Sequence, residues 1–435
     1  MPASSPVAFD AVVIGAGIVG LANALALAKQ GLRVVVLERH ARAEGASIRN
    51  FGMIWPIGQP AGALFAQARR SREIWAGLGR EAGFFIRETG SLHLAHREDE
   101  AGVLEEFARL APDLGVPVEL LSRAETLARS PLANPDNLRC ALWSAGEVCV
   151  DPREAVAKLP DHLRRAFGIE FHFSTPVVRI DDGAAISSEG RLFRAPRIVV
   201  CTGEDLRTLF PGAYAGSGIR RCKLQMLRTV PQPAGWNPGP MIASGLTLRH
   251  YTIFQVCPSL KAVQERVARE TPELDRFGIH VMASQHRDGG MVLGDSHEYG
   301  ADITPFDRAE IDELILRELR PLVRLPRWDI AERWHGVYAK HPSLAEFTAE
   351  PAPGVFGREC AGRCGDDPVL RRGGRFLGRQ IGHGSDRRIN GSQAERFRVS
   401  VAGRKTSTHP ATKRRPVPRR SSRSARRSRG TLRRP

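Results

Sequence analysis

Three closely spaced glycines and a later glutamate are the first residues whose types and spacing indicate chemistry. Gly15, Gly17 and Gly20 follow an apolar run, and Glu38 closes a second apolar run. In a strand–turn–helix unit the first glycine permits a tight turn, the second lets the backbone approach a pyrophosphate, and the third lets helix pack on strand. A helix that begins at Ile18 directs its N-terminal N–H groups at the phosphates. The Glu38 carboxylate can accept both hydroxyls of a ribose, so the pattern predicts a dinucleotide site.

The elements that must position these residues occur in the required order. Residues 11–14 and 33–38 read as buried parallel strands, a helix is expected from Ile18 to about Gln30, and Gly31 ends it. The alternative, a glycine-rich turn in another kind of α/β domain, would not need an acid at the end of the second strand. Glu38 would repel the 2′-phosphate of NADP, which leaves FAD and NAD as the candidates.

Three further stretches carry a family resemblance. They are "GASIRNFGMIWPIGQP" (45–60), "EFHFSTPVVRID" (170–181) and "APRIVVCTGEDL" (195–206). With the glycine pattern, they make the chain from about Phe9 to Phe356 similar to the D-amino-acid oxidase-like family of FAD-dependent oxidoreductases, which includes glycine oxidase and sarcosine oxidase. The resemblance implies FAD as cofactor. It also implies a set of cofactor-binding positions: Gly15, Gly17, Gly20, Glu38, Ser47, Asn50, Val177 (facing adenine through its backbone), Thr202 and Gly203.

The family fold implied by the resemblance is α/β with an α+β insert. A Rossmann-like FAD domain (7–85, 146–215 and 331–356) is interleaved with an antiparallel-sheet substrate domain (86–145 and 216–330). The coarse pattern agrees, because alternating or apolar runs at 90–95, 220–230, 279–285 and 290–296 read as sheet strands. Residues 357–435 are expected to form a disordered basic tail.

The resemblance implies oxidation of a small anionic amine or amino acid to an imine. Hydride passes from the carbon beside nitrogen to flavin N5, and oxygen or another acceptor then takes the electrons. Arg249 is the first choice for binding the anion, because a guanidinium matches a carboxylate or phosphonate bidentately. His250, Tyr251, His286 and His297 could add donors, and Arg49 is expected near the flavin. The alternatives are that Arg249 pairs with a surface acid and that Arg49 caps its loop.

Three segments are similar to a subgroup associated with phosphonate breakdown. They are "SGLTLRHY" (244–251), "GDSHEYG" (294–300) and "ERWHGVYAKHP" (332–342). A phosphonate carries a second negative charge, which favours several basic donors over one arginine. The resemblance therefore implies an aminophosphonate as one candidate substrate.

The net charge is concentrated at the C-terminal end. Residues 357–435 hold 23 Lys and Arg against 5 Asp and Glu, whereas residues 1–356 hold 41 against 42. Seven scattered cysteines favour reduced thiols in a cytoplasmic protein, and the Cys360–Cys364 pair lacks a second pair at zinc spacing, so no metal site is expected. Residues 11–28 are uncharged but interrupted by three glycines and Asn23, so no membrane span is expected.

The segment that follows "PGVF" (353–356) does not match the family. An apolar strand, a glycine-rich turn and a helix, of the pattern V-V-x-x-x-G-G-x-G-M-T-L-S-F-G, should follow, yet the chain reads "GRECAGRCGDDPVLRR". With suitably chosen synonymous codons, a shift of one base turns this run into VVNALGGAGMTLSF. We therefore expect a frameshift rather than an evolved basic tail, and an enzyme impaired by it. The alternative is a nucleic-acid-binding arm on a flavoprotein-like body, which its lack of aromatic residues disfavours.

Overall fold

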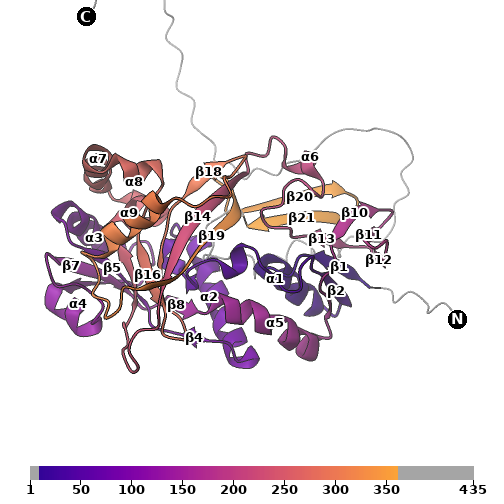
Figure 1. Ribbon diagram of the computed structural model, residues 1–435, viewed down its shortest axis with the longest axis horizontal. Helices are drawn as coiled ribbons and strands as arrows, with labels where there is room; N and C mark the ends of the chain where they lie inside the picture. The colour runs from indigo at the N-terminus through magenta and orange to yellow at the C-terminus, as the bar shows by residue number, and fades with distance from the viewer. Residues whose placement is uncertain (1–8, 361–435) are drawn as a thin grey trace, which may run out of the picture. The chain divides into compact units, whose positions relative to one another are not determined.

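The structure is a computed structural model that describes residues 9–360. Except at 357–360, the expectations for the basic segment lie outside the described residues. The described residues form two large sheets, and both are drawn in Figure 1.

The first sheet contains both strands of the glycine pattern. Its order is β20 (Glu346–Ala352), β21 (Val355–Cys360), β13 (Ile198–Val200), β1 (Ala11–Ile14), β2 (Val34–Leu37) and β9 (Glu170–His172). All neighbours pair in parallel except β20, which is antiparallel to β21. The chain therefore brings its N-terminal, middle and C-terminal parts into one sheet, as the interleaved family fold requires.

The alternation of side chains along these strands explains why both faces of the sheet are covered. Ala11, Val13, Val34 and Val36 pack on one face against α1 (Ile18–Ala28), α2 (Ala63–Ala82) and α5 (Pro152–Phe167). The intervening residues of the same strands pack on the other face with β10 (Val177–Asp181), β11 (Ala184–Ser187) and β12 (Leu192–Arg194), which form a small antiparallel sheet.

The second large sheet carries the expected substrate domain. Its order is β18 (Glu298–Gly300), β14 (Arg220–Thr229), β17 (Met291–Gly294), β16 (Met282–Gln285), β15 (Met241–Ser244), β5 (Ser91–Ala95), β7 (Cys140–Ser144) and β6 (Glu119–Ser122), with β19 (Ile330–Lys340) also paired to β14. Its neighbouring strands are antiparallel except β5 and β15, which are parallel.

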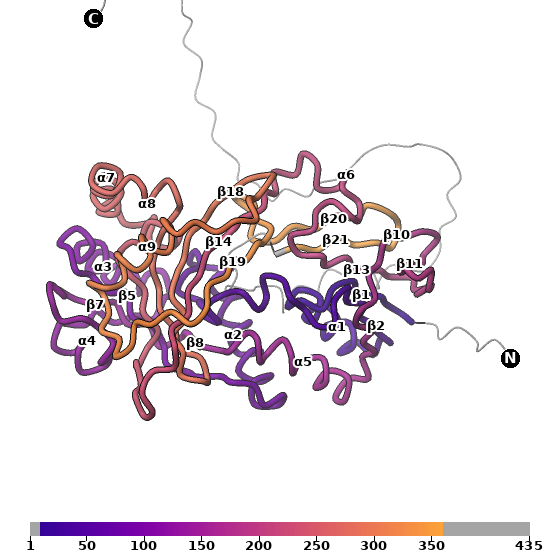
Figure 2. The backbone as a smooth tube through the Cα atoms, viewed as in Figure 1, coloured from indigo at the N-terminus to yellow at the C-terminus, as the bar shows by residue number. Residues whose placement is uncertain are grey.

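Helices and short segments complete the described part of the chain (Figure 2). The substrate part holds α3 (Glu98–Leu110), α4 (Arg123–Arg129), α7 (Leu260–Glu270), α8 (Pro272–Arg276) and α9 (Ala309–Leu319). The strands β3 (Met53–Ile54), β8 (Val148–Val150) and β4 (Ile86–Arg87) form a further small sheet, in that order. The short helix α6 (Pro211–Tyr214) precedes β14. The 3-10 turns are η1 (Ala46–Ile48), η2 (Pro56–Gly58), η3 (Gly245–Arg249) and η4 (Thr252–Val256).

Two boundaries differ from the sequence expectation. All but the first residue of β19 falls within 331–356, which was expected in the FAD domain, yet β19 pairs along β14 from Arg220–Lys340 to Thr229–Ile330 and is part of the second sheet. The prediction that no strand continues beyond Phe356 is also wrong, because β21 runs to Cys360 between β13 and β20. Backbone pairing with β20 extends this strand to Cys360 despite its polar side chains, whereas pairing with β13 ends at Gly357.

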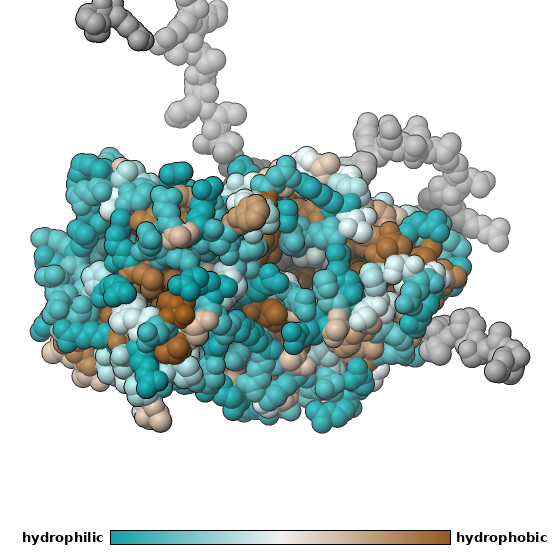
Figure 3. Space-filling view, in the orientation of Figure 1, coloured by the Kyte–Doolittle hydropathy of each residue, from teal (hydrophilic) through white to brown (hydrophobic). Residues whose placement is uncertain are grey.

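The surface and the thiols agree with a protein whose apolar residues are mostly inside. The face in Figure 3 is largely hydrophilic, with hydrophobic residues in small separate patches. The five cysteines at 140, 149, 201, 222 and 257 are buried and unbridged. Within residues 9–360, no helix has both the length and the apolar character that crossing a bilayer requires.

Candidate functional site

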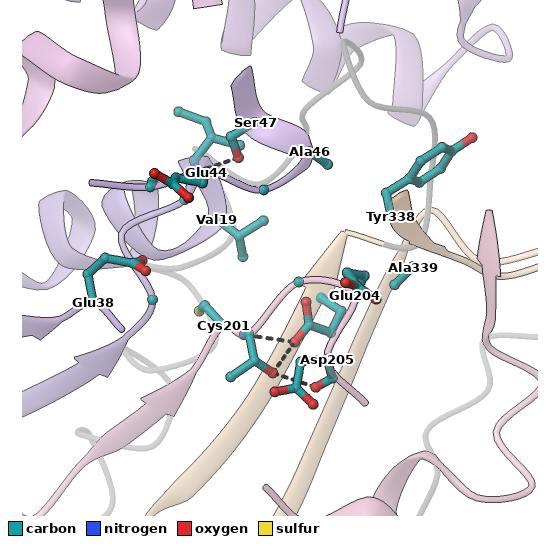
Figure 4. Close-up of a pocket in the computed structure, with 18 of the residues that line it drawn as sticks. Val19, Glu38, Glu44, Ala46, Ser47, Cys201, Glu204, Asp205, Tyr338 and Ala339 are labelled. Carbon is teal, nitrogen blue, oxygen red and sulfur yellow. Dashed lines mark hydrogen bonds between the residues drawn. The ribbon is translucent and has the colours of Figure 1, made fainter. Parts of the chain in front are cut away.

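A pocket lies where β1, β2 and β13 end, and we call it the nucleotide pocket (Figure 4). In open parallel sheets, ligands bind at the carboxyl ends of the strands, which is where this pocket lies. Glu38 lies at one end of the view and Tyr338 at the other, with Ser47 and Cys201 on opposite sides between them. Eight of the nine predicted cofactor positions line it: Gly15, Gly17, Glu38, Ser47, Asn50, Val177, Thr202 and Gly203.

The three glycines differ in their backbone conformation and in what a Cβ at each would meet. Gly15 has φ +105°, and a Cβ there would lie 2.2 Å from the carbonyl oxygen of Cys201. A Cβ at Gly20 would lie 1.8 Å from the carbonyl oxygen of Gly15, so this glycine allows α1 to pack against the turn. Gly17 has an ordinary φ of −67°, and its Cβ would meet only the Ser47 hydroxyl, at 3.2 Å. The protein itself therefore demands Gly15 and Gly20, whereas Gly17 faces open pocket.

The N-terminus of α1 is held open toward the pocket by Ser47. Gly17 is the N-cap and has no side chain to offer, and the Ser47 hydroxyl instead accepts a hydrogen bond from Ile18 N at 3.0 Å. Ser47 lies in η1, 29 residues along the chain, so it fixes the loop after β2 against the first turn of α1. The other N-terminal N–H groups of the helix give this wall an affinity for anions.

Glu38 is buried and already bonded to the backbone. Its Oε2 accepts from Ala16 N at 2.8 Å and its Oε1 accepts from His40 N at 3.0 Å. Each carboxylate oxygen has a second lone pair, so the group retains capacity to accept ribose hydroxyls. Glu38 thus both locks the glycine turn and presents acceptors at one end of the pocket.

Glu359 also lines the nucleotide pocket, and the sequence reasoning missed it. It lies in β21, in the segment where no strand was expected, and its side chain is buried. Its Oε1 accepts from Thr202 N at 3.1 Å, from Thr202 Oγ1 at 3.4 Å and from Tyr214 Oη at 3.5 Å. The carboxylate therefore occupies the backbone donor at the turn that was predicted to meet the cofactor.

Burial dominates the electrostatics of Glu359. It raises the pKa of this carboxyl well above the ordinary glutamate value, although the backbone N–H groups of Thr202 and Gly203 act in the opposite sense. Burial likewise raises the pKa of the neighbouring Tyr214 hydroxyl, with the Glu359 charge as the next cause. In its ionised form, a carboxyl in this place would oppose a second anion in the same pocket.

Asn50 and Arg49 have structural contacts in their loop. The Asn50 amide donates to the Ala46 and Ser47 carbonyl oxygens, and its Oδ1 accepts from Gly52 N at 2.8 Å. Arg49 does not line the nucleotide pocket; its Nη1 donates to the carbonyl oxygen of His335 at 3.3 Å. These contacts join the loop after β2 to β19.

The remaining predicted catalytic residues lie elsewhere. Arg249 and His250 line a second pocket, which also contains the basic residues Arg220, Lys340 and His341. Arg249 forms an ion pair with Asp275, and its Nη2 donates to the carbonyl oxygen of Ile279 at 3.4 Å. Tyr251 is buried in an apolar cluster, with its ring centroid 6.2 Å from that of Trp55 and its hydroxyl 3.3 Å from the Met282 sulfur. The structure therefore separates Tyr251 from the pocket that Arg249 and His250 share.

The nucleotide pocket offers one donor set suited to a diphosphate and one acceptor set suited to a ribose. The N-terminus of α1 supplies the former and Glu38 the latter, and both lie at the ends of adjacent parallel strands. No protein nucleophile or acid–base pair is positioned in it by the predicted residues. The described residues therefore fit an extended dinucleotide, except at Glu359.

Comparison with known proteins identifies a family of proteins that use a dinucleotide cofactor. The family described as FAD dependent oxidoreductase (DAO) matches residues 10–365. Glycine oxidase of Geobacillus kaustophilus is 26% identical over 205 residues, which are 45% of this chain and 54% of that protein. Monomeric sarcosine oxidase of Streptomyces avermitilis is 28% identical over 204 residues, 45% of this chain and 52% of that protein. The chain thus spans about half the length of these curated relatives.

Solved structures extend the likeness over most of the described chain. Glycine oxidase from Bacillus cereus superposes with a TM-score of 0.67 at 18% identity, covering 87% of this chain and 96% of that one. L-proline dehydrogenase from P. horikoshii gives 0.65 at 21% identity, covering 86% and 95%. At such identities the likeness establishes the fold.

Proposed function

This chain belongs to the family of FAD-dependent oxidoreductases, and on that premise we propose that it is built to oxidise a small anionic amine or amino acid to an imine. The observation that carries the proposal is the convergence of the glycine turn, the α1 N-terminus and Glu38 at the ends of β1 and β2. FAD, when bound, would supply the acceptor for the hydride that leaves the carbon beside the nitrogen.

The residues of the nucleotide pocket would bind FAD in a defined direction. The N–H groups at the start of α1 would face the pyrophosphate, and Gly17 would let the backbone approach it. Glu38 would accept the ribose hydroxyls, and Val177 would meet adenine with its backbone. This direction puts the other end of the cofactor toward Tyr338 and Ala339, on β19.

The second pocket supports an anionic substrate. Arg220, Arg249, His250, Lys340 and His341 all line it. Arg249 lines this pocket while its guanidinium is held by an ion pair with Asp275. Several basic groups in one pocket favour a dianionic end group over a single carboxylate, which supports a small aminophosphonate as the substrate. Oxygen or another acceptor would then take the electrons.

We also propose that the chain as written binds FAD poorly because its reading frame changes after Phe356. The buried Glu359 carboxyl occupies the Thr202 N–H and adds an acid to a pocket that must take a diphosphate. Restoring the shifted frame, so that 357–370 read VVNALGGAGMTLSF, replaces both Arg358 and Glu359 by residues without charge.

The test compares two forms of the protein, the chain as written and the frame-restored chain. Each is purified, and bound flavin is measured per chain from the visible absorption of the protein. Turnover is then followed with glycine, sarcosine and 2-aminoethylphosphonate, using oxygen and an artificial electron acceptor. We expect stoichiometric FAD and amine oxidation from the restored chain, with little of either from the chain as written.

Two outcomes would contradict the proposal in different ways. A restored chain that folds but binds no FAD would refute the cofactor assignment. Full flavin and full turnover in the chain as written, lost when it is cut after Phe356, would instead show that the basic segment is a functional element.

A further inference from the structure

A cluster of histidines lies outside the nucleotide pocket, at one edge of the second sheet. His250 follows η3, His280 precedes β16, and His297 lies shortly after β17. The ring centroids of His250 and His280 are 3.8 Å apart, and those of His250 and His297 are 4.5 Å apart. Asp295, the first residue after β17, lies against the same group. Three separate parts of the chain thus bring three imidazoles and one carboxylate together.

The arrangement has the dimensions of a metal site. One nitrogen from each histidine lies within 4.8 Å of the others. The Asp295 carboxylate is 3.4 Å from His280 Nε2 and 3.9 Å from His297 Nε2. Around a tetrahedral Zn²⁺ with bonds of about 2.0–2.1 Å, neighbouring ligand atoms are about 3.3–3.4 Å apart. We propose that His250, His280, His297 and Asp295 bind one Zn²⁺ or a similar divalent transition metal, with small side-chain rotations closing the longer edges.

A contact outside the cluster orients one of the ligands, His297. His297 Nδ1 lies 3.3 Å from the carbonyl oxygen of Gly278, which directs its proton there and leaves Nε2, on the side of Asp295, with a lone pair for a metal ion. Metal-bound histidines usually have such a second partner. Gly278 has φ +56°, and a Cβ there would lie 2.9 Å from the His297 Cβ, so the glycine permits this approach.

Backbone hydrogen bonds fix His280 and Asp295 relative to each other. His280 N donates to the carbonyl oxygen of Asp295 at 3.3 Å, and Asp295 N donates to that of His280 at 2.9 Å. These two residues therefore face each other whatever their side chains do. The pairing holds their ligand atoms near the required separation before a metal arrives.

Burial and charge favour a cation over an anion. His280, His297 and Asp295 are only 3%, 6% and 4% exposed, so a bare charge among them would lack hydration. An anion held by protonated imidazoles would lie against the Asp295 carboxylate, which would repel it. The adjacent Arg249 does not add an uncompensated positive charge, because it pairs with Asp275. His250 lines the second pocket and so gives a metal a path of entry from solvent.

The test uses the full-length chain without an affinity tag, stripped by dialysis against a chelator. Zn²⁺ is titrated in competition with a chromophoric chelator, and Co²⁺ is added separately to read the coordination from its visible spectrum. We expect one Zn²⁺ per chain with a Kd below about 1 µM. We expect His280→Ala and Asp295→Asn to weaken binding by about 100-fold and about 10-fold or more, respectively.

Matched controls separate this site from other ligands in the chain. His172→Ala removes a histidine on β9, and Cys364→Ser breaks the Cys360–Cys364 pair; both should leave the Kd unchanged. Zn²⁺ should also raise the melting temperature of the unmodified chain by more than that of Asp295→Asn, which keeps the shape of the side chain. Absence of stoichiometric Zn²⁺, or equal affinity in Asp295→Asn, would overturn the proposal. The Asp295→Asn result decides even where His280→Ala fails to fold.

Discussion

Gly17→Ala and Gly20→Ala should separate the cofactor contact from the packing of the fold. At Gly20 the new Cβ would lie 1.8 Å from a backbone carbonyl oxygen, so α1 must move off the turn. Overpacking of this kind costs about 1–3 kcal/mol or more. At Gly17 the backbone already suits alanine, and the nearest atom is the Ser47 hydroxyl at 3.2 Å. A lower entropy of the unfolded chain and a poorer N-cap oppose each other, so stability should change by less than about 1 kcal/mol.

For FAD affinity, in contrast to stability, we expect the substitution at Gly17 to matter more than the one at Gly20. The Gly17 methyl would stand where the pyrophosphate meets the backbone, and we expect the FAD Kd to rise at least about tenfold, which is about 1.4 kcal/mol. Denaturant unfolding of the apoprotein gives the first quantity, and FAD titration by flavin fluorescence in the frame-restored chain gives the second. If Gly17→Ala retains stoichiometric FAD with an unchanged Kd, or unfolds as readily as Gly20→Ala, the assignment of the glycine pattern is wrong.

Three further perturbations test other parts of the site. Ser47→Ala removes the acceptor for Ile18 N and should cost about 0.5–2 kcal/mol in unfolding free energy, whereas Ser47→Thr should restore most of it. Arg249→Ala should raise the KM for an anionic amine by about 10- to 100-fold, from a charged hydrogen bond of about 1.5–3 kcal/mol, and leave FAD content unchanged; an unaltered KM removes Arg249 from the substrate pocket. Because burial raises the pKa of Glu359, the folded chain keeps a proton there that the unfolded chain loses above about 4.5. Stability should therefore fall as pH rises from 4.5 through the raised pKa, and Glu359→Gln should flatten that dependence in urea unfolding.

The residues that sequence reasoning found are those whose roles depend on local geometry. Gly15 is required by the positive φ of the turn, and Gly20 by the close approach of α1 to Gly15. Glu38, at the end of the next strand, accepts a hydrogen bond from the turn at Ala16 N. The positive φ of Gly15, the close approach of Gly20 to Gly15 and the bond from Ala16 N to Glu38 all lie within one strand–helix–strand unit, so spacing alone can reveal these residues. The same is true of the strands at 91–95 and 282–285, whose apolar pattern reflects burial.

The contacts it did not find depend on partners that come from distant parts of the chain. Asp275 could not be recognised as the partner of Arg249 from the sequence, because 26 residues and two helices separate them. His250, His280 and His297 have no motif spacing, since the fold of the second sheet alone brings them together. Ser47 was predicted as a cofactor residue, but its hydrogen bond to Ile18 N depends on where η1 lies.

β21 shows how backbone and side-chain requirements can diverge within one strand. Val200 pairs with Gly357, and on the other edge Thr348 and Phe347 pair with Arg358 and Glu359. Such pairing uses only N–H and C=O groups, so it continues past the last apolar residue whatever the side chains are. The pleat then buries two ionisable side chains, Arg358 and Glu359, at 6% and 3% exposure. Because a buried carboxylate beside a diphosphate would be unfavourable for both, we expect position 359 to suit a neutral residue, as in the frame-restored chain proposed above.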